Sequence, residues 1–243
     1  EGVITVISKE RYRTAGVYDY KENFQITLNN EQQAVVDEVT RDMEQGRQQT
    51  YLLHGITGSG KTEVYVKIVK KTIEMGKQAI ILIPEIALTY QTVRYFRNYF
   101  GDRVTIINSR LSDGERYDQF MRAKNGDVDV VIGPRSALFA PFQNLGIIII
   151  DEEHETSYKS DYPPKYHARE TAVKRAELEH ASVLLGSATP SVESYHRALN
   201  GTYRLLELHE RAGSGQLAKT SIVDLRKELK AGNRSIISRE LAD

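Results

Sequence analysis

Residues 55–62 read Gly-Ile-Thr-Gly-Ser-Gly-Lys-Thr, the G-x-x-x-x-G-K-T pattern of a phosphate-binding loop. Glycines let the backbone curl so that successive N–H groups face phosphate oxygens, and a helix that follows adds the positive end of its dipole. In such a loop Lys61 would reach the β- and γ-phosphates of a nucleoside triphosphate, and Thr62 would hold Mg²⁺. An apolar stretch precedes the loop and a helical pattern follows it. Phosphate binding requires this context, whereas a plain glycine-serine turn does not.

Four ionisable residues, Asp-Glu-Glu-His, follow the apolar run of residues 147–150. Because ligands bind at the carboxyl ends of parallel strands, Asp151 could hold Mg²⁺ together with the threonine of the loop, and Glu152 could polarise an attacking water. We expect Glu153 to be structural. For His154 two roles stay open: a contact with the γ-phosphate or the coupling machinery, or a partly buried, hydrogen-bonded histidine. The predicted catalytic residues are Lys61, Asp151, Glu152 and His154.

Residues 186–190, Gly-Ser-Ala-Thr-Pro, end the next predicted buried strand. The hydroxyls of Ser187 and Thr189 should therefore face the same edge of the sheet as Asp151. Alone, the segment could be a helix cap with Pro190 at the first helical position. Beside an Asp-Glu-x-His strand it resembles the coupling motif of superfamily 2 helicases.

The segment after His154 interleaves aromatic and cationic side chains. It contains Tyr158, Tyr162, Tyr166 and His167, with Lys159, Lys165 and Arg169, against the acid Asp161. Aromatic faces stack on bases and cations follow phosphates, so this composition suits single-stranded DNA. The alternative is a surface loop pinned by two prolines, with its tyrosines packed on the sheet.

The elements that would position these groups alternate along the chain. After an asparagine-capped helix near residues 30–43, strands are predicted at 51–54, 78–83, 104–107, 128–132, 146–151 and 182–186, and helices at 61–75, 88–99, 114–124, 168–178 and 191–198. Short strands are also predicted near 203–208 and 221–223. Apolar strands separated by helices indicate a parallel sheet covered on both faces. The predicted fold is α/β, a RecA-like P-loop NTPase domain over residues 25–212. Residues 1–24 would be a linker or the tail of a preceding domain, and 213–243 a connection with a charged helix or linker.

Composition sets broad bounds. The 243 residues are 40% hydrophobic, enough to fill a core, and 33 basic side chains balance 33 acidic ones. Any contact with nucleic acid must therefore come from a local patch. No cysteine is present, which excludes disulfides, thiol catalysis and thiolate metal sites, and a cytoplasmic location is expected. The longest apolar run is too short to span a membrane, so no membrane partner is expected.

The motifs follow one another in the order found in helicases. Over residues 25–243 their sequences are similar to those of the PriA family of bacterial replication-restart DNA helicases. The resemblance implies a DExH-type motor that moves 3′ to 5′ on DNA with ATP and Mg²⁺, acts at stalled forks and takes part in primosome assembly. It implies that the nucleotide is held by Gln32, which would contact adenine, and by Gly55, Thr57, Gly58, Ser59, Gly60, Lys61 and Thr62. It also implies that Pro84, Thr89, Arg135 and Ser136 follow the single-strand path. Pro84 could equally end a strand, and Arg135 could pair with an acidic neighbour.

The resemblance further implies parts that this chain lacks: a second motor domain whose arginine completes the site, a cysteine-rich zinc module, and a fork-binding region. We therefore expect the chain to bind nucleotide weakly, to hydrolyse ATP slowly and not to unwind DNA. Expected partners are single-stranded and forked DNA, primosome proteins and single-strand-binding protein. The alternatives are a RecG-like or restriction-type translocase and a non-catalytic primosome docking module. A P-loop kinase is disfavoured because residues 186–190 would then have no purpose.

Overall fold

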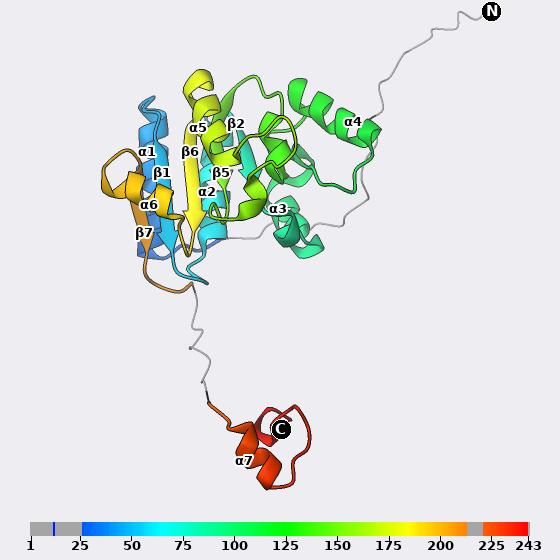
Figure 1. Ribbon diagram of the computed structural model, residues 1–243. Helices are drawn as coiled ribbons and strands as arrows, with labels where there is room; N and C mark the ends of the chain where they lie inside the picture. Colours follow the sequence, from blue (N-terminus) through cyan, green and yellow to red (C-terminus); the bar gives the residue numbers. More distant parts are fainter. Residues whose placement is uncertain (1–11, 13–25, 213–220, 243) are drawn as a thin grey trace, which may run out of the picture. The chain divides into compact units, whose positions relative to one another are not determined.

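The computed structural model describes residues 12, 26–212 and 221–242 of the chain (Figure 1). Apart from residue 12, the predicted linker over residues 1–24 lies outside these ranges, as does the Gly-Ser-Gly segment that begins at residue 213. Contacts divide the chain into two units, and the boundary in the sequence falls between Ala212 and Gly213. The second unit contains the short helices α7 (Leu225–Lys230) and α8 (Arg239–Ala242).

Within the described residues of the first unit, seven strands form one sheet in the order β3-β4-β2-β5-β6-β1-β7, and every pairing is parallel. The strands are β1 (Thr50–Gly55), β2 (Gln78–Leu82), β3 (Val104–Ile106), β4 (Val130–Gly133), β5 (Leu145–Ile150), β6 (Ser182–Ser187) and β7 (Arg204–Leu208). The α-helices are α1 (Asn30–Glu44), α2 (Lys61–Glu74), α3 (Tyr90–Phe100), α4 (Asp113–Lys124), α5 (Ala168–Glu179) and α6 (Val192–Leu199), with short 3-10 helices at η1 (Glu85–Ala87), η2 (Gly101–Arg103), η3 (Arg135–Phe139) and η4 (Thr156–Tyr158). The predicted α/β fold is confirmed.

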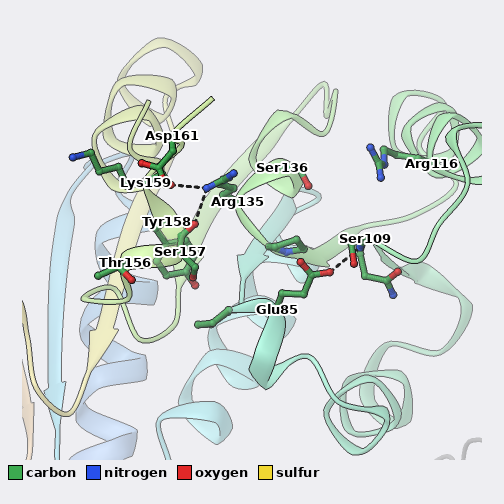
Figure 2. A pocket seen from close by; sticks show the side chains of 13 residues that line it. Glu85, Ser109, Arg116, Arg135, Ser136, Thr156, Ser157, Tyr158, Lys159 and Asp161 are labelled. Carbon is green, nitrogen blue, oxygen red and sulfur yellow. Dashed lines mark hydrogen bonds between the residues drawn. The ribbon is translucent and has the colours of Figure 1, made fainter. Parts of the chain in front are cut away.

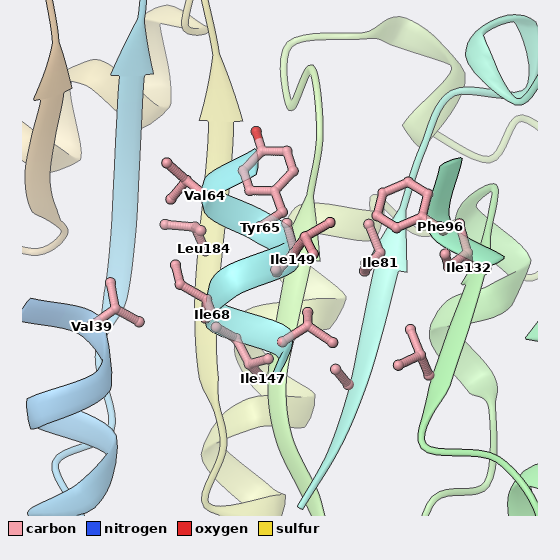
Figure 3. Close-up of a cluster of buried hydrophobic side chains, with 14 of the residues drawn as sticks. Val39, Val64, Tyr65, Ile68, Ile81, Phe96, Ile132, Ile147, Ile149 and Leu184 are labelled. Carbon is pink, nitrogen blue, oxygen red and sulfur yellow. The ribbon is translucent and has the colours of Figure 1, made fainter. Parts of the chain in front are cut away.

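Helices cover both faces of the sheet because neighbouring residues of each buried strand point to opposite sides. On β5, Ile147 and Ile149 join the apolar cluster with α1, α2 and α3, whereas Ile148 and Ile150 join the cluster with α4, α5 and α6. Figure 3 shows the first cluster between α2 and the strands. Burying each of these isoleucine side chains contributes roughly 1.5–3 kcal/mol to the stability of the fold, relative to leaving it exposed.

One predicted strand is wrong. Residues 221–224 carry no regular structure and lead into α7. The side chain of Ile222 is 97% exposed, and no strand in the described part of the chain pairs with the Ser-Ile-Val pattern. Alternation forms a strand only where a ladder partner is present.

Strand order places the sequence motifs at one edge of the sheet. The phosphate-binding loop follows β1, residues 151–154 follow β5, and residues 187–190 close β6, which lies between those two strands. On the other side of β5, Pro84 lies two residues after the end of β2 and Pro134 directly follows β4. The end of β5 therefore lies between two groups of motifs, which is where ligands of parallel α/β sheets bind.

Among the described helices, none is long and apolar enough to cross a membrane.

Candidate functional site

The loop after β1 has the backbone of a phosphate cradle. Gly58 and Gly60 have positive φ angles of 79° and 77°, which only glycine adopts without strain, and α2 begins directly afterwards at Lys61. A Cβ on Gly60 would also come within 2.2 Å of Nε2 of Gln32. The ammonium of Lys61 donates to the carbonyl of Gly55 at 3.0 Å, across the mouth of the loop. The fold thus brings together a helix N-terminus and a lysine, as a phosphate requires.

Gln32 supports this loop through a hydrogen bond from its side chain. Its Nε2 donates to the carbonyl of Ser59 at 2.8 Å, and its Oε1 accepts the backbone N–H of Asn29 at 2.9 Å. Asn29 and Gln32 form a capping box at the start of α1, a local device that stabilises helices by about 1 kcal/mol. Gln32 is buried, and its bonds to other described residues use one of its two amide hydrogens and one of the two lone pairs of its amide oxygen. Its contact with adenine stays a prediction, and bracing the loop is the role that sequence reasoning missed.

A metal site fits the residues beside the loop. Thr62 and Asp151 line the same cavity of about 370 Å³, and the hydroxyl of Ser59 is buried with no hydrogen-bond partner among the described residues. Burial raises the pKa of Asp151 to about 6, and the neighbouring carboxylate of Glu152 adds to the shift, while the hydroxyl of Tyr65 and the ammonium of Lys61 oppose it. A carboxylate and a hydroxyl are oxygen ligands of the kind that Mg²⁺ takes. The donor set therefore fits Mg²⁺.

The end of β5 contacts the end of β6 through His154. Its Nδ1 lies 2.7 Å from the hydroxyl of Ser187, and its Nε2 lies 3.5 Å from the hydroxyl of Thr189. Ser187 in turn accepts the backbone N–H of Thr189 at 3.0 Å. Oε2 of Glu152 lies 3.6 Å from Nδ1 of His154. Glu152 has a φ of 46°, a left-handed backbone conformation that costs roughly 1–3 kcal/mol for a residue with a side chain. The structure thus brings Glu152, His154, Ser187 and Thr189 together.

A groove of about 620 Å³ lies on the other side of β5, at the ends of β2 and β4 (Figure 2). It is lined by Pro84, Glu85, Asn108, Ser109, Arg116, Pro134, Arg135, Ser136 and residues 156–159 and 161. The guanidinium of Arg135 donates to the carbonyls of Ser157 and Lys159 at 3.1 and 2.5 Å, so it joins the segment after β4 to the segment after β5. Thr89 instead caps α3 by accepting the N–H of Thr92, and it does not line the groove.

Comparison with known families shows which protein family carries these two groups of motifs. A family model described as DEAD/DEAH box helicase matches residues 29–198, which include the loop, the end of β5 and residues 186–190. The chain belongs to the DEAD/DEAH box helicase family.

Similar proteins narrow the relationship. Replication restart protein PriA of Bacillus subtilis (strain 168) is 47% identical over 224 residues, which are 92% of this chain and 28% of that protein. The protein of the same name from Synechocystis sp. is 51% identical over 195 residues, 78% of this chain and 24% of the relative. A structure of RecG bound to a three-way DNA junction has a TM-score of 0.59 at 25% identity, and the match covers 80% of this chain and 25% of that one. The resemblance to the PriA family is confirmed, and the chain spans about a quarter of the length of these relatives.

The prediction that Arg169 of this DEAD/DEAH box helicase chain contacts DNA is wrong. Its side chain is only 8% exposed, and its Nη1 donates to the buried carboxylate of Glu153 at 2.7 Å. The same guanidinium donates to the hydroxyls of Ser191 and Ser194 at the start of α6. Arg169 is therefore a structural tie between β5, α5 and α6, and the expectation that Glu153 is structural is confirmed. The sequence placed Arg169 at the end of an aromatic segment but held no sign of its buried acidic partner.

Tyr158 is the second correction. Its ring is 1% exposed, and its hydroxyl donates to the main-chain carbonyl of Asp151 at 2.7 Å, so it cannot stack on a base. Its neighbour Lys159 is exposed, and Tyr162 is 80% exposed. Tyr166 packs edge-on against Phe139, with ring centroids 5.2 Å apart.

His167 is the N-cap of α5, where its ring accepts the N–H of Arg169. For Lys159, Tyr162, Tyr166 and His167 the DNA role stays a prediction. Sequence reasoning did not assign several groove residues to this site, among them Glu85, Ser109 and Arg116. Glu85 accepts the N–H of Ser109 at 2.9 Å, and Arg116 reaches the groove from α4 with its Nε buried and without a hydrogen-bond partner in the described part of the chain. Only three-dimensional proximity could have revealed them.

Proposed function

We propose that this chain is the ATP-binding motor domain of a 3′-to-5′ DNA helicase that acts in replication restart at stalled forks and in primosome assembly. The observation that supports this most is the convergence of the loop after β1, residues 151–154 and residues 187–190 at the ends of three adjacent strands, with a groove of about 620 Å³ on the other side of β5. The relatives named replication restart proteins support the biological setting.

Each residue has a role that follows from its position. The N–H groups of the loop and the ammonium of Lys61 bind the phosphates. Gln32 braces the loop through its hydrogen bond to the carbonyl of Ser59, and it contacts adenine. Thr62 and Asp151 would hold Mg²⁺, which neutralises phosphate charge when bound. Glu152 takes the proton of the attacking water, and its strained backbone holds it at the end of β5. His154 relays the state of this site to Ser187 and Thr189.

The groove takes single-stranded DNA. Arg135 and Arg116 supply charge for phosphates, Ser136 supplies a hydroxyl, and Tyr162 offers an exposed ring for a base. Because Arg135 bonds the carbonyls beside Tyr158, and Tyr158 bonds the carbonyl of Asp151, strand binding and the nucleotide site share one stretch of backbone. This continuity favours a motor over a docking module without activity.

The site in this chain is half of a helicase site. An arginine from a second motor domain would complete it, so the isolated chain hydrolyses ATP slowly and does not unwind DNA. Zinc would belong to a module elsewhere in the longer protein. The partners are single-stranded and forked DNA, primosome proteins and single-strand-binding protein, in the cytoplasm.

Nucleotide binding to the 243-residue chain tests this function. A fluorescent ATP analogue should bind in the presence of Mg²⁺ and be displaced by unlabelled ATP, and Lys61→Ala should weaken binding by about 10- to 100-fold, the worth of charge-assisted contacts. Thermal unfolding of the variant should match that of the unchanged chain. Equal affinity in both chains would exclude Lys61 as the phosphate ligand and contradict the proposal.

A further inference from the structure

Tyr65 is a buried tyrosine whose hydroxyl reaches the nucleotide site from the core. It lies on α2, one turn after Thr62, and its side chain is 1% exposed. In Figure 3 its ring packs in the apolar cluster while its hydroxyl projects from the edge of that cluster. The hydroxyl donates to Oδ1 of Asp151 at 2.9 Å. None of the motif positions includes this residue.

The strand beside Tyr65 is shaped to admit this hydroxyl. A Cβ on Gly186 would lie 1.8 Å from Oη of Tyr65 and 2.9 Å from its Cζ, closer than non-bonded atoms approach. The φ angle of Gly186 is not positive, so a larger residue would be free of backbone strain there. Glycine is therefore required at this position for space, and the space is occupied by the tyrosine hydroxyl.

A phenylalanine would fill the same part of the core without a polar atom. Burying a hydroxyl is unfavourable unless it forms a hydrogen bond, and the hydroxyl of Tyr65 bonds a carboxylate, which is a stronger partner than a neutral group. Asp151 is also held at its main-chain carbonyl by Tyr158, at 2.7 Å. Two tyrosines from different elements thus fix the backbone and the side chain of the same aspartate.

We infer that Tyr65 is a positioning residue for the magnesium site: its hydroxyl holds the carboxylate of Asp151 in one orientation for the metal ion, and Gly186 provides the room. This inference rests on the proposed function, because it assumes that Asp151 and Thr62 hold Mg²⁺ with a nucleotide. Hydrogen-bond partners that orient a metal-binding carboxylate are typically worth 10- to 100-fold in metal affinity.

Tyr65→Phe removes the hydroxyl and keeps the ring. The test measures binding of a fluorescent ATP analogue to the 243-residue chain over a range of Mg²⁺ concentrations. The half-saturating Mg²⁺ concentration should rise about 10- to 100-fold, while affinity for the analogue without Mg²⁺ stays the same. Tyr51→Phe is the matched control, since Tyr51 is equally buried and donates to the carboxylate of Asp42 at 2.9 Å, away from the nucleotide site. It should leave the Mg²⁺ dependence unchanged.

Gly186→Ala provides a second, independent variant. Its methyl group should displace the hydroxyl from Asp151 and raise the half-saturating Mg²⁺ concentration as Tyr65→Phe does. A double variant that combines Tyr65→Phe with Gly186→Ala lacks the 1.8 Å contact between the new Cβ and Oη of Tyr65. Its melting temperature should therefore exceed that of Gly186→Ala alone. If either single variant folds and shows the Mg²⁺ dependence of the unchanged chain, Tyr65 has no positioning role. If the unchanged chain itself binds nucleotide without any effect of Mg²⁺, the proposed function fails, and the role of Tyr65 fails with it.

Discussion

Replacing Arg169 by methionine should destabilise the fold without removing a contact to DNA. The guanidinium of Arg169 is buried and lies 2.7 Å from Oε2 of Glu153, whose side chain is fully buried. Methionine preserves most of the side-chain volume but leaves the carboxylate of Glu153 without its cation. This carboxylate also accepts hydrogen bonds from the backbone and hydroxyl of Ser191 and from the hydroxyl of Ser194, at 2.7, 3.1 and 2.8 Å.

The loss of folding stability expected for Arg169→Met follows from the burial of this ion pair. Removing one partner of a buried ion pair costs about 3–5 kcal/mol, because an uncompensated charge stays in the interior. Three remaining hydrogen bonds to Glu153 soften the loss, so we expect about 3 kcal/mol for Arg169→Met. For a domain of this size, about 2–4 °C is lost per kcal/mol, which gives a fall in Tm of roughly 6–12 °C.

Thermal and urea unfolding, followed by circular dichroism, measure this difference. Arg204→Met is the matched control, since Arg204 also lies 2.7 Å from a glutamate, Glu38, but its side chain is 59% exposed. An exposed pair of this kind is worth less than about 1 kcal/mol. Affinity for single-stranded DNA should be the same in Arg169→Met as in the unchanged chain, at a temperature where both are folded. An unchanged Tm together with weaker DNA binding would show that Arg169 acts at the surface, and would refute this reasoning.

Three further predictions follow from other parts of the site. Tyr162→Ala should weaken binding of a fluorescent single-stranded oligonucleotide by about 1–3 kcal/mol, as expected for one stacked base, and an unchanged affinity would remove Tyr162 from the strand path. His154→Ala should leave binding of the fluorescent ATP analogue unchanged but reduce the stimulation of ATP hydrolysis by DNA in the longer protein, whereas full stimulation would exclude a coupling role. Without nucleotide or Mg²⁺, Asp151→Asn should raise stability at pH 7.5 by roughly 2–3 kcal/mol, since each unit of pKa shift is worth about 1.4 kcal/mol. The folded pKa of about 6 lies above the unfolded value of 3.8, so stability is lost as the pH rises between these values, and a gain that is just as large at pH 4 would contradict the shift.

The nucleotide motifs were predictable because they are local in sequence. The order of glycines and lysine in residues 55–62 needs only a strand before it and a helix after it, and both are present. The parallel sheet then brings residues 151–154 and 187–190 to the same edge, as the alternation of apolar strands predicted. Their contact through His154 follows from β6 lying next to both β5 and β1.

The aromatic segment was less predictable because composition does not tell which side of a loop is buried. Tyr158 and Tyr162 are both tyrosines close in sequence, yet one bonds Asp151 in the interior and the other is 80% exposed. Apart from its neighbour Glu170, Arg169 bonds Glu153 and two serines at the start of α6, which lie 16 to 25 residues from it in sequence. The role of Tyr65 likewise depends on Gly186, which lies on a separate strand. Such contacts require the tertiary structure.

The most direct test of the central claim is the rate of ATP hydrolysis by the longer protein that we propose contains this chain, measured with and without forked DNA. We predict that forked DNA raises the rate severalfold, and that the 243-residue chain alone hydrolyses ATP slowly in both conditions. A rate that forked DNA leaves unchanged would contradict a DNA motor.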